Sequence, residues 1–155
     1  MSNPFWDYSV AAYSRDGVPQ ACLELQDCCG LDVNVLLYGA WLAVLDRRLT
    51  RPHLADIDVG VEEWRSKVVQ PLRSLRRELR SYPAAAAIRE DIKAVELRGE
   101  RQQQDIMYEI HRACDDQPTA NRPLHENLAL VAVFTCPGDA SWRIPIEQVC
   151  TLLGP

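Results

Sequence analysis

Histidine is scarce in this sequence, and the common signatures of catalytic and metal sites are missing. The 155 residues include three histidines, His53, His111 and His125, which stand at no spacing typical of zinc ligands. The six cysteines form no C-x-x-C motif. No Gly-x-Ser-x-Gly elbow, Walker loop or dinucleotide fingerprint is present. We therefore expect no catalytic residue, no metal ligand and no cofactor.

Long apolar runs and an excess of positive charge are missing as well. The longest apolar run, residues 33–45, contains Asn34 and falls short of the roughly 20 residues that cross a bilayer. The first residues, MSNPFWDYS, lack the basic and apolar segments of an export signal. The net charge of −5 argues against general affinity for nucleic acid. We expect a cytoplasmic protein with reduced cysteines, no membrane span and no nucleic-acid partner.

What the sequence does contain is helical periodicity. Hydrophobic residues make up 47% of the chain and charged residues 25%, which is ordinary for a globular domain. Apolar residues recur at helical spacing, and the alternating pattern of strands is nearly absent. The sequence predicts an all-α fold, a single compact bundle of about six helices that forms one domain over residues 1–155.

Capping residues and prolines predict where the helices begin and end. The predicted helices cover residues 4–14, 19–29, 33–49, 59–80, 84–114 and 121–136, with a short last helix at 146–153. Asn3 is expected to cap the first helix, Asp32 the third and Asp58 the fourth, with Gly30 ending the second and residues 50–58 as a loop. Pro71 should kink the fourth helix, and Tyr82-Pro83 should join it to the fifth as an antiparallel hairpin.

Four arginines form a stripe on the fourth predicted helix. Arg65, Arg73, Arg76 and Arg80 project within about an 80° arc beside the apolar seam. One interpretation pairs them with acidic residues of the fifth helix, namely Glu90, Asp91, Glu96, Glu100, Asp105 and Glu109. The other makes the stripe an anion-binding groove or a docking face, because guanidinium groups suit phosphate and carboxylate.

Two polar residues near the second helix boundary are further candidates for the site. Asp27 stands in the last turn of a helix, where the dipole disfavours a carboxylate, so it is either solvated or paired with an arginine of the fourth helix. Asn34 begins the central third helix and either bonds local backbone groups or contacts a ligand.

The adjacent cysteines Cys28 and Cys29 could oxidise or bind a soft metal only if they were exposed and activated. Nothing in the sequence indicates activation. We expect both thiols to be buried and inert.

Two longer segments resemble a known family. They are GVPQACLELQDCCGLDVNVLLYGAWL, residues 17–42, and Trp64-Arg65 followed by VVQPLRSLRREL, residues 68–79; Trp6 and Tyr13 add to the pattern. Together they resemble a family of small proteobacterial proteins classified as domain of unknown function 2390. The resemblance implies a cytoplasmic bacterial protein and brings no activity, ligand or catalytic residue with it.

Two functional hypotheses follow from these features. The first is a non-enzymatic interaction or adaptor protein, which docks an acidic or amphipathic protein partner on the basic face of the helix at about 59–80. The second is a small-molecule binder or enzyme for a phosphorylated or carboxylated ligand. Its ligand would lie in an interhelical pocket formed by Arg65, Arg73, Arg76, Asp27 and Asn34.

Overall fold

The computed structural model describes residues 2–114, 118 and 121–155, and this part of the chain is helical without a strand. The α-helices are α1 (Pro4–Tyr13), α2 (Val18–Cys29), α3 (Val33–Val44), α4 (Arg51–Trp64), α5 (Gln70–Glu78), α6 (Ala86–Arg112), α7 (Leu124–Thr135) and α8 (Arg143–Leu153). A π-helical turn, Arg65–Val69, joins α4 to α5, and two 3₁₀ turns, Leu79–Ser81 and Pro83–Ala85, join α5 to α6. The predicted all-α fold is confirmed.

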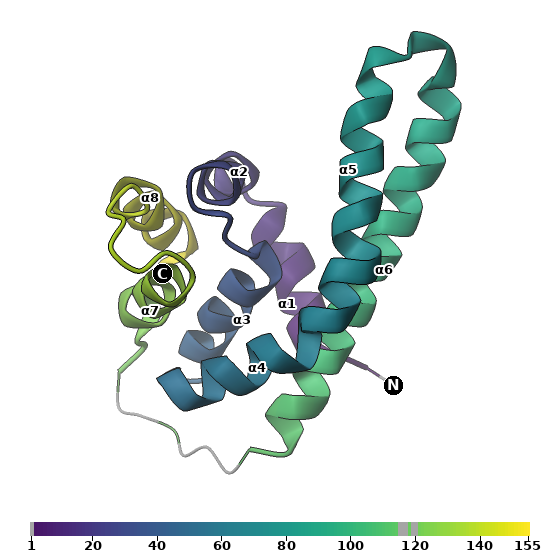
Figure 1. Cartoon of the computed structure of the whole chain (residues 1–155). Coiled ribbons are helices and arrows are strands. Elements are labelled where there is room, and N and C mark those ends of the chain that lie inside the picture. The colour runs from purple at the N-terminus through teal and green to yellow at the C-terminus, as the bar shows by residue number, and fades with distance from the viewer. Residues whose placement is uncertain (1, 115–117, 119–120) are drawn as a thin grey trace.

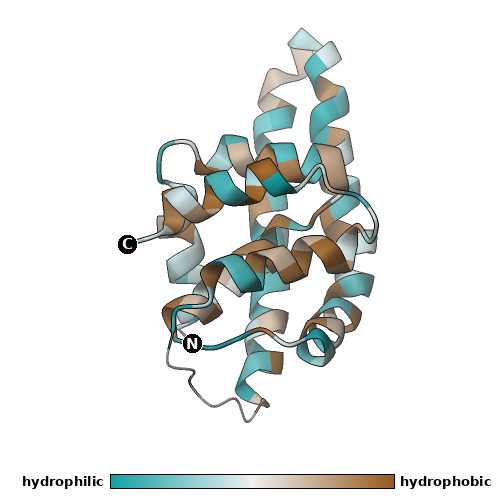
Figure 2. Cartoon of the chain, turned by 90° about the vertical axis from the view of Figure 1, so that its left-hand side faces the viewer, coloured by the Kyte–Doolittle hydropathy of each residue, from teal (hydrophilic) through white to brown (hydrophobic). Residues whose placement is uncertain are grey.

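The helices form a bundle from which one hairpin projects. Helix α3 lies in the middle of the bundle, packed against α7 and α1, while α2 packs against α8 (Figure 1). Helices α5 and α6 run antiparallel as the sequence predicts, and their far ends extend beyond the bundle (Figure 1). The hairpin is mostly hydrophilic, whereas the bundle carries most of the hydrophobic residues (Figure 2). Among the described residues, no helix combines the length and the apolar character of a membrane span.

The core is organised around α3, as its apolar character on all sides predicts. Every residue of α3 from Asn34 to Ala43 is buried. Phe5 packs edge-on against Tyr38, with ring centroids 5.4 Å apart. Asn127 of α7 is fully buried, and its side chain accepts the amide hydrogen of Leu49 and donates to the carbonyl of Gly39. These bonds tie α3 and the segment after it to α7.

The local signals at the first helix boundaries are confirmed. Asn3 caps α1 by accepting the amide hydrogens of Phe5 and Trp6. Asp32 caps α3 by accepting that of Asn34 at 2.9 Å. Gly30 ends α2 with a φ of 62°, a left-handed conformation that glycine adopts without steric cost.

The predicted boundary between the third and fourth helices is wrong. Helix α3 ends at Val44 and not near Leu49, because Asp46 adopts a left-handed conformation that stops the helix. Residues 51–58, predicted as a loop, form the first half of α4. Pro52 is compatible with this because a first helical turn needs no amide hydrogen there. Thr50 is the cap, and Asp58 lies inside the helix.

The predicted bend in the fourth helix is present, and its cause lies just before Pro71. Helix α5 leaves the direction of α4 at the π-helical turn (Figure 1). Within this turn the amide of Gln70 bonds to the carbonyl of Arg65, five residues earlier. One residue is thereby added to the turn, so side chains before and after it are offset by about 100° from a straight α-helical projection.

Candidate functional site: a groove beside the hairpin

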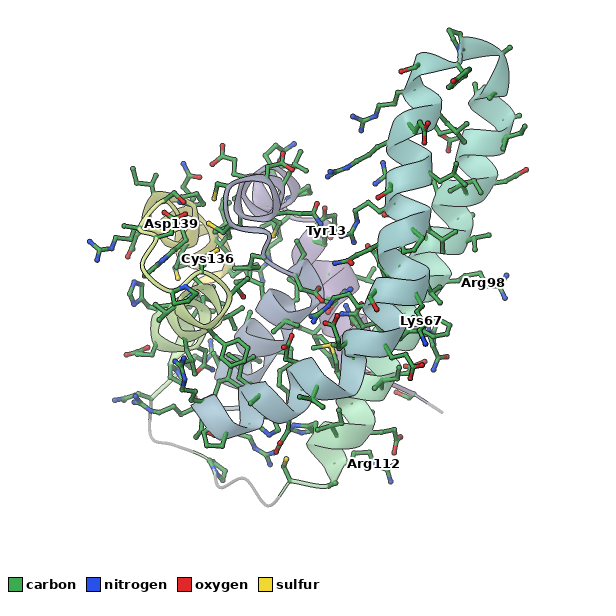
Figure 3. The ribbon with its side chains drawn as sticks, in the orientation of Figure 1. Tyr13, Lys67, Arg98, Arg112, Cys136 and Asp139 are labelled. Atoms are coloured by element: carbon green, nitrogen blue, oxygen red, sulfur yellow. The ribbon has the colours of Figure 1, made fainter. Side chains whose placement is uncertain are left out.

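A groove separates the α5–α6 hairpin from α1, α2 and the start of α3. We call it the hairpin groove; it has a volume of about 360 Å³. Its lining residues are Trp6, Ser9, Val10, Tyr13, Pro19, Gln20, Leu23, Gln26, Val33, Asn34, Leu37, Arg73, Arg76, Arg77, Arg80, Glu96, Leu97, Glu100 and Gln104. Tyr13 lies between the bundle and the hairpin, which marks the position of the groove (Figure 3).

The groove exposes an unusual amount of apolar side chain. Val10 and Tyr13 of α1 are 51% and 43% exposed, Leu23 of α2 is 47% exposed, and Leu97 of α6 is 53% exposed. Single exposed apolar residues are common on proteins, whereas a group of them from three helices in one groove is typical of a contact surface.

Arg73 and Arg76 lie on the opposite wall and are held by internal ion pairs. Arg76 donates from Nε and Nη2 to the two carboxylate oxygens of Glu96. Arg73 donates from Nε to Glu96 at 3.2 Å and from Nη2 to Glu100 at 2.9 Å. The predicted pairing with the fifth helix is therefore confirmed for these two arginines. Their charges are neutralised within the hairpin.

The pKa values of Glu96 and Glu100 are shifted in opposite directions by this arrangement. Burial alone would raise the pKa of Glu96, but hydrogen bonds from Arg76 and Arg73 outweigh it and lower the pKa below its ordinary value. For Glu100, burial raises the pKa, and the attraction of Arg73 does not fully offset it. Glu96 thus belongs to the neutralising network as a carboxylate, while the charged form of Glu100 is disfavoured.

Arg77 and Arg80 supply the positive charge that the glutamates leave uncompensated. The Arg77 side chain is 42% exposed and hydrogen-bonds the side-chain oxygen of Gln26 at 3.2 Å. Arg80 is exposed and forms no ion pair within the described part of the chain. Four arginines and two glutamates line the groove, which leaves two positive charges in excess. Sequence projection missed Arg77, which it placed about 100° away from Arg76.

Arg65 does not join the other arginines. Its guanidinium bonds to Asp32 at 3.2 Å, to Asp58 at 2.7 Å and to Glu62. It lines a second pocket of about 460 Å³ on the other side of Arg73 and Arg77, which line both pockets. The π-helical turn explains the separation, because it rotates Arg65 away from the stripe predicted for a regular helix.

Hydrogen bonds with the surrounding carboxylates fix the charge of Arg65. Burial lowers the pKa of its guanidinium, whereas the hydrogen bonds that it donates to Glu62 and Asp58 and the charge of Asp32 together raise the pKa above its usual range. The side chain of Arg65 is only 14% exposed, and it connects the cap of α3 to α4. This geometry favours a structural role for Arg65 over contact with an acidic partner.

Asn34 lies at the floor of the hairpin groove, where polar groups are buried. Its side-chain oxygen accepts a hydrogen bond from Gln104 Nε2 at 2.9 Å. Within the described residues, Gln104 Oε1 and Ser9 Oγ are buried and have no hydrogen-bond partner. Both residues line the groove. Buried polar atoms without partners are uncommon in folded proteins.

Asp27 lies outside both pockets and forms a long ion pair with the α5–α6 hairpin. Its carboxylate is 3.7 Å from Arg77 Nη2, and both side chains are largely exposed. The sequence predicted either solvation or an arginine of the fourth helix as partner. The partner is Arg77, and the contact is at the protein surface.

The comparisons with known proteins show the family of this chain and assign no activity. The family model described as "Protein of unknown function (DUF2390)" matches residues 4–107, which include α1 to α5 and most of α6. The chain belongs to this family. Neither curated proteins nor solved structures gave a match.

Proposed function

We propose that this DUF2390 protein is a non-enzymatic adaptor that binds an acidic amphipathic helix of a partner protein in the hairpin groove. The observation that carries the proposal is the composition of that groove. Exposed apolar side chains of α1 and α2 face the hairpin, which adds Leu97 of α6. On the hairpin side Arg77 and Arg80 are paired with neither Glu96 nor Glu100, and the contact of Arg77 with Asp27 is a 3.7 Å surface contact. An amphipathic helix would place its apolar face on the apolar side chains and its acidic residues against these two arginines.

The charge distribution supports an acidic partner more than it supports a neutral one. The chain as a whole has a net charge of −5, yet the groove has an excess of positive charge. A local field opposite to that of the whole protein favours one orientation of an acidic segment and disfavours binding elsewhere. We place this interaction in the bacterial cytoplasm, in keeping with the family resemblance of the sequence.

The experiment is a quantitative pull-down from a lysate of the source organism. It compares the wild type with a variant in which two arginines of the groove are replaced by glutamate. The Arg77→Glu/Arg80→Glu variant keeps the ion pairs of Glu96 intact, which Arg73 and Arg76 variants would break. We expect the variant to retain at least tenfold less of the partner than the wild type does. Its circular dichroism spectrum should be unchanged. A partner retained equally by both proteins would reject the groove.

The matched control reverses the same number of charges on the same hairpin. Lys93 and Arg98 of α6 are exposed and do not line the groove, and Arg98 points away from the bundle (Figure 3). The Lys93→Glu/Arg98→Glu variant should bind the partner within twofold of the wild type. An equal loss in both variants would mean that net charge and not the groove determines binding.

A second candidate function is binding of a phosphorylated or carboxylated small molecule, and the groove floor favours it. In the part of the chain that the structure describes, Gln104 Oε1 and Ser9 Oγ are buried without hydrogen-bond partners, and both residues line the same groove as the arginines. A small anion with hydroxyl or amine groups could satisfy such atoms if the hairpin opened slightly. Thermal-shift screening with phosphorylated and carboxylated metabolites separates the two functions, because only a small-molecule site would give a stabilisation that saturates.

A further inference from the structure

A second cluster of reactive side chains lies on the far side of the bundle from the hairpin. It forms where the end of α2 meets the turn between α7 and α8. The ligand atoms of Cys29, Cys136 and Asp139 all lie within 4.8 Å of one another. Cys136 and Asp139 lie together at this turn (Figure 3). The cluster is separate from the hairpin groove, and Cys136 and Asp139 lie beyond the residues that match the family model.

The backbone holds two members of the cluster side by side. Cys136 follows the last residue of α7, and Gly138, with a φ of 85°, reverses the chain after it. The amide of Asp139 bonds to the carbonyl of Cys136 at 3.3 Å. Ligands separated by two residues in such a turn are the common arrangement in zinc-binding loops. Here the sequence is Cys-Pro-Gly-Asp, with a carboxylate in place of the second thiolate.

Neighbouring groups orient the carboxylate of Asp139. The amide of Ser141 donates to Asp139 Oδ1 at 2.9 Å. Hydrogen bonds of this kind fix the direction of a metal-binding carboxylate. Asp139 is exposed, Cys136 is half-buried and Cys29 is buried, so the site opens to solvent on one side. An ion can therefore enter without opening the core.

The separations suit a tetrahedral ion of the zinc type. Two thiolates bound to Zn²⁺ at 2.3 Å lie about 3.8 Å apart, so the observed upper limit of 4.8 Å requires movements of about 1 Å at most. Cys28 lies outside the group of atoms within 4.8 Å of one another, but its Sγ is 2.8 Å from Cys29 Sγ and its side chain is exposed, so a rotation of this side chain can bring in a fourth donor. The expectation that both adjacent cysteines are buried is wrong for Cys28.

We propose that Cys29, Cys136 and Asp139, with Cys28 as the fourth ligand, bind one zinc-type divalent cation. Each thiol that coordinates gives up its proton to solvent, and no electron is transferred. In the structure the Cys136 thiol donates a hydrogen bond to the Cys29 carbonyl at 2.6 Å. Thiols are weak donors, and the bond to the ion would replace this contact. The ion would clamp the end of α2 to the α7–α8 turn. Sequence analysis missed this site because its ligands come from segments more than 100 residues apart.

The test is a titration of the full-length, fully reduced protein with Co²⁺ and Zn²⁺ after treatment with a chelator. We expect one ion per chain, a thiolate-to-cobalt charge-transfer band, a higher melting temperature and the release of about three protons per Zn²⁺. Absence of stoichiometric binding to the folded wild type would overturn the proposal.

Variants separate the ligands from the other thiols. Cys136→Ser and Cys29→Ser should abolish the cobalt band and the thermal shift, and Asp139→Asn should weaken binding at least tenfold. Cys28→Ser should lower proton release by one per ion, and an unchanged count would overturn its assignment as the fourth ligand. Cys150→Ser is the control, because Cys150 lies on α8 outside the cluster and its removal should change nothing. If the folded Cys136→Ser variant binds the ion as tightly as the wild type, the proposed site is contradicted.

Discussion

Arg76 and Glu96 form a two-bond ion pair across the hairpin, and Glu96 accepts a further bond from Arg73. The Glu96 side chain is 7% exposed, so both arginines depend on a carboxylate that water barely reaches. The pair joins α5 to α6 at the level of the groove. It explains why two of the arginines in the predicted stripe serve the hairpin itself.

Replacing Glu96 should destabilise the protein in a pH-dependent way. Glu96→Gln leaves Arg76 without its countercharge and Arg73 with Glu100 as its one remaining carboxylate partner in the hairpin, and we expect a loss of about 2–3 kcal/mol at pH 7. Because the folded pKa of Glu96 is lowered, its stabilisation is complete above the ordinary pKa and disappears as the pH falls through the lowered value. Urea unfolding at pH 7 and pH 3 should therefore show a smaller difference at pH 3. A difference that does not shrink with acid would contradict the assigned charge state.

Glu100, on the same helix, should have the opposite effect on the pH dependence of folding stability. Its folded pKa is raised, so the ionised carboxylate reduces stability as the pH rises above the ordinary value. Glu100→Gln should be neutral or stabilising by up to about 1 kcal/mol at pH 7, because the amide oxygen can still accept from Arg73. The same unfolding measurement serves as the check. A destabilisation equal to that of Glu96→Gln would show that both carboxylates matter equally as charges.

Even a conservative replacement of Arg65 should lower the free energy of unfolding. Three carboxylates surround its guanidinium, and a lysine cannot reach them with one ammonium group. We expect Arg65→Lys to lose about 1–2 kcal/mol and Arg65→Met about 3 kcal/mol of unfolding free energy. Chemical denaturation gives both values. A lysine variant as stable as the wild type would mean that only the charge matters.

Asp27 and Arg77 should be almost independent in stability. Their charged groups are 3.7 Å apart, and both side chains are largely exposed to water. Exposed ion pairs of this kind contribute less than about 0.5 kcal/mol. A double-mutant cycle with Asp27→Asn and Arg77→Gln measures the coupling directly. A coupling above about 1 kcal/mol would require a buried contact that this geometry does not have.

The parts of the fold that could be predicted are those determined by neighbouring residues. Asp32 and Gly30 act within one turn of their own position, and the structure confirms both. The end of α3 could not be predicted, because Leu45 and Leu49 continue its apolar spacing while Asp46 stops the helix. Leu49 is buried by a different route, with its amide bonded to Asn127. Such long-range contacts override local periodicity.

The candidate site was predicted only in part, because the backbone departs from a regular helix. Arg73, Arg76, Arg80 and Asn34 do line one groove, as helical projection and proximity suggested. Arg65 falls outside it because a straight projection cannot anticipate a π-helical turn. Most of the exposed apolar residues of the groove come from α1 and α2, whose position beside the hairpin no local pattern encodes.

The central claim is that the hairpin groove binds an acidic amphipathic helix, and site-specific photo-crosslinking tests it most directly. A photoreactive amino acid replaces Leu23 inside the groove or, as a control, Val59, which is 78% exposed on α4 outside it. We predict that position 23 crosslinks to an acidic amphipathic segment of one partner, that position 59 does not, and that Arg77→Glu/Arg80→Glu abolishes the crosslink. Equal crosslinking from both positions, a captured segment without acidic residues, or a crosslink unaffected by charge reversal would contradict the account.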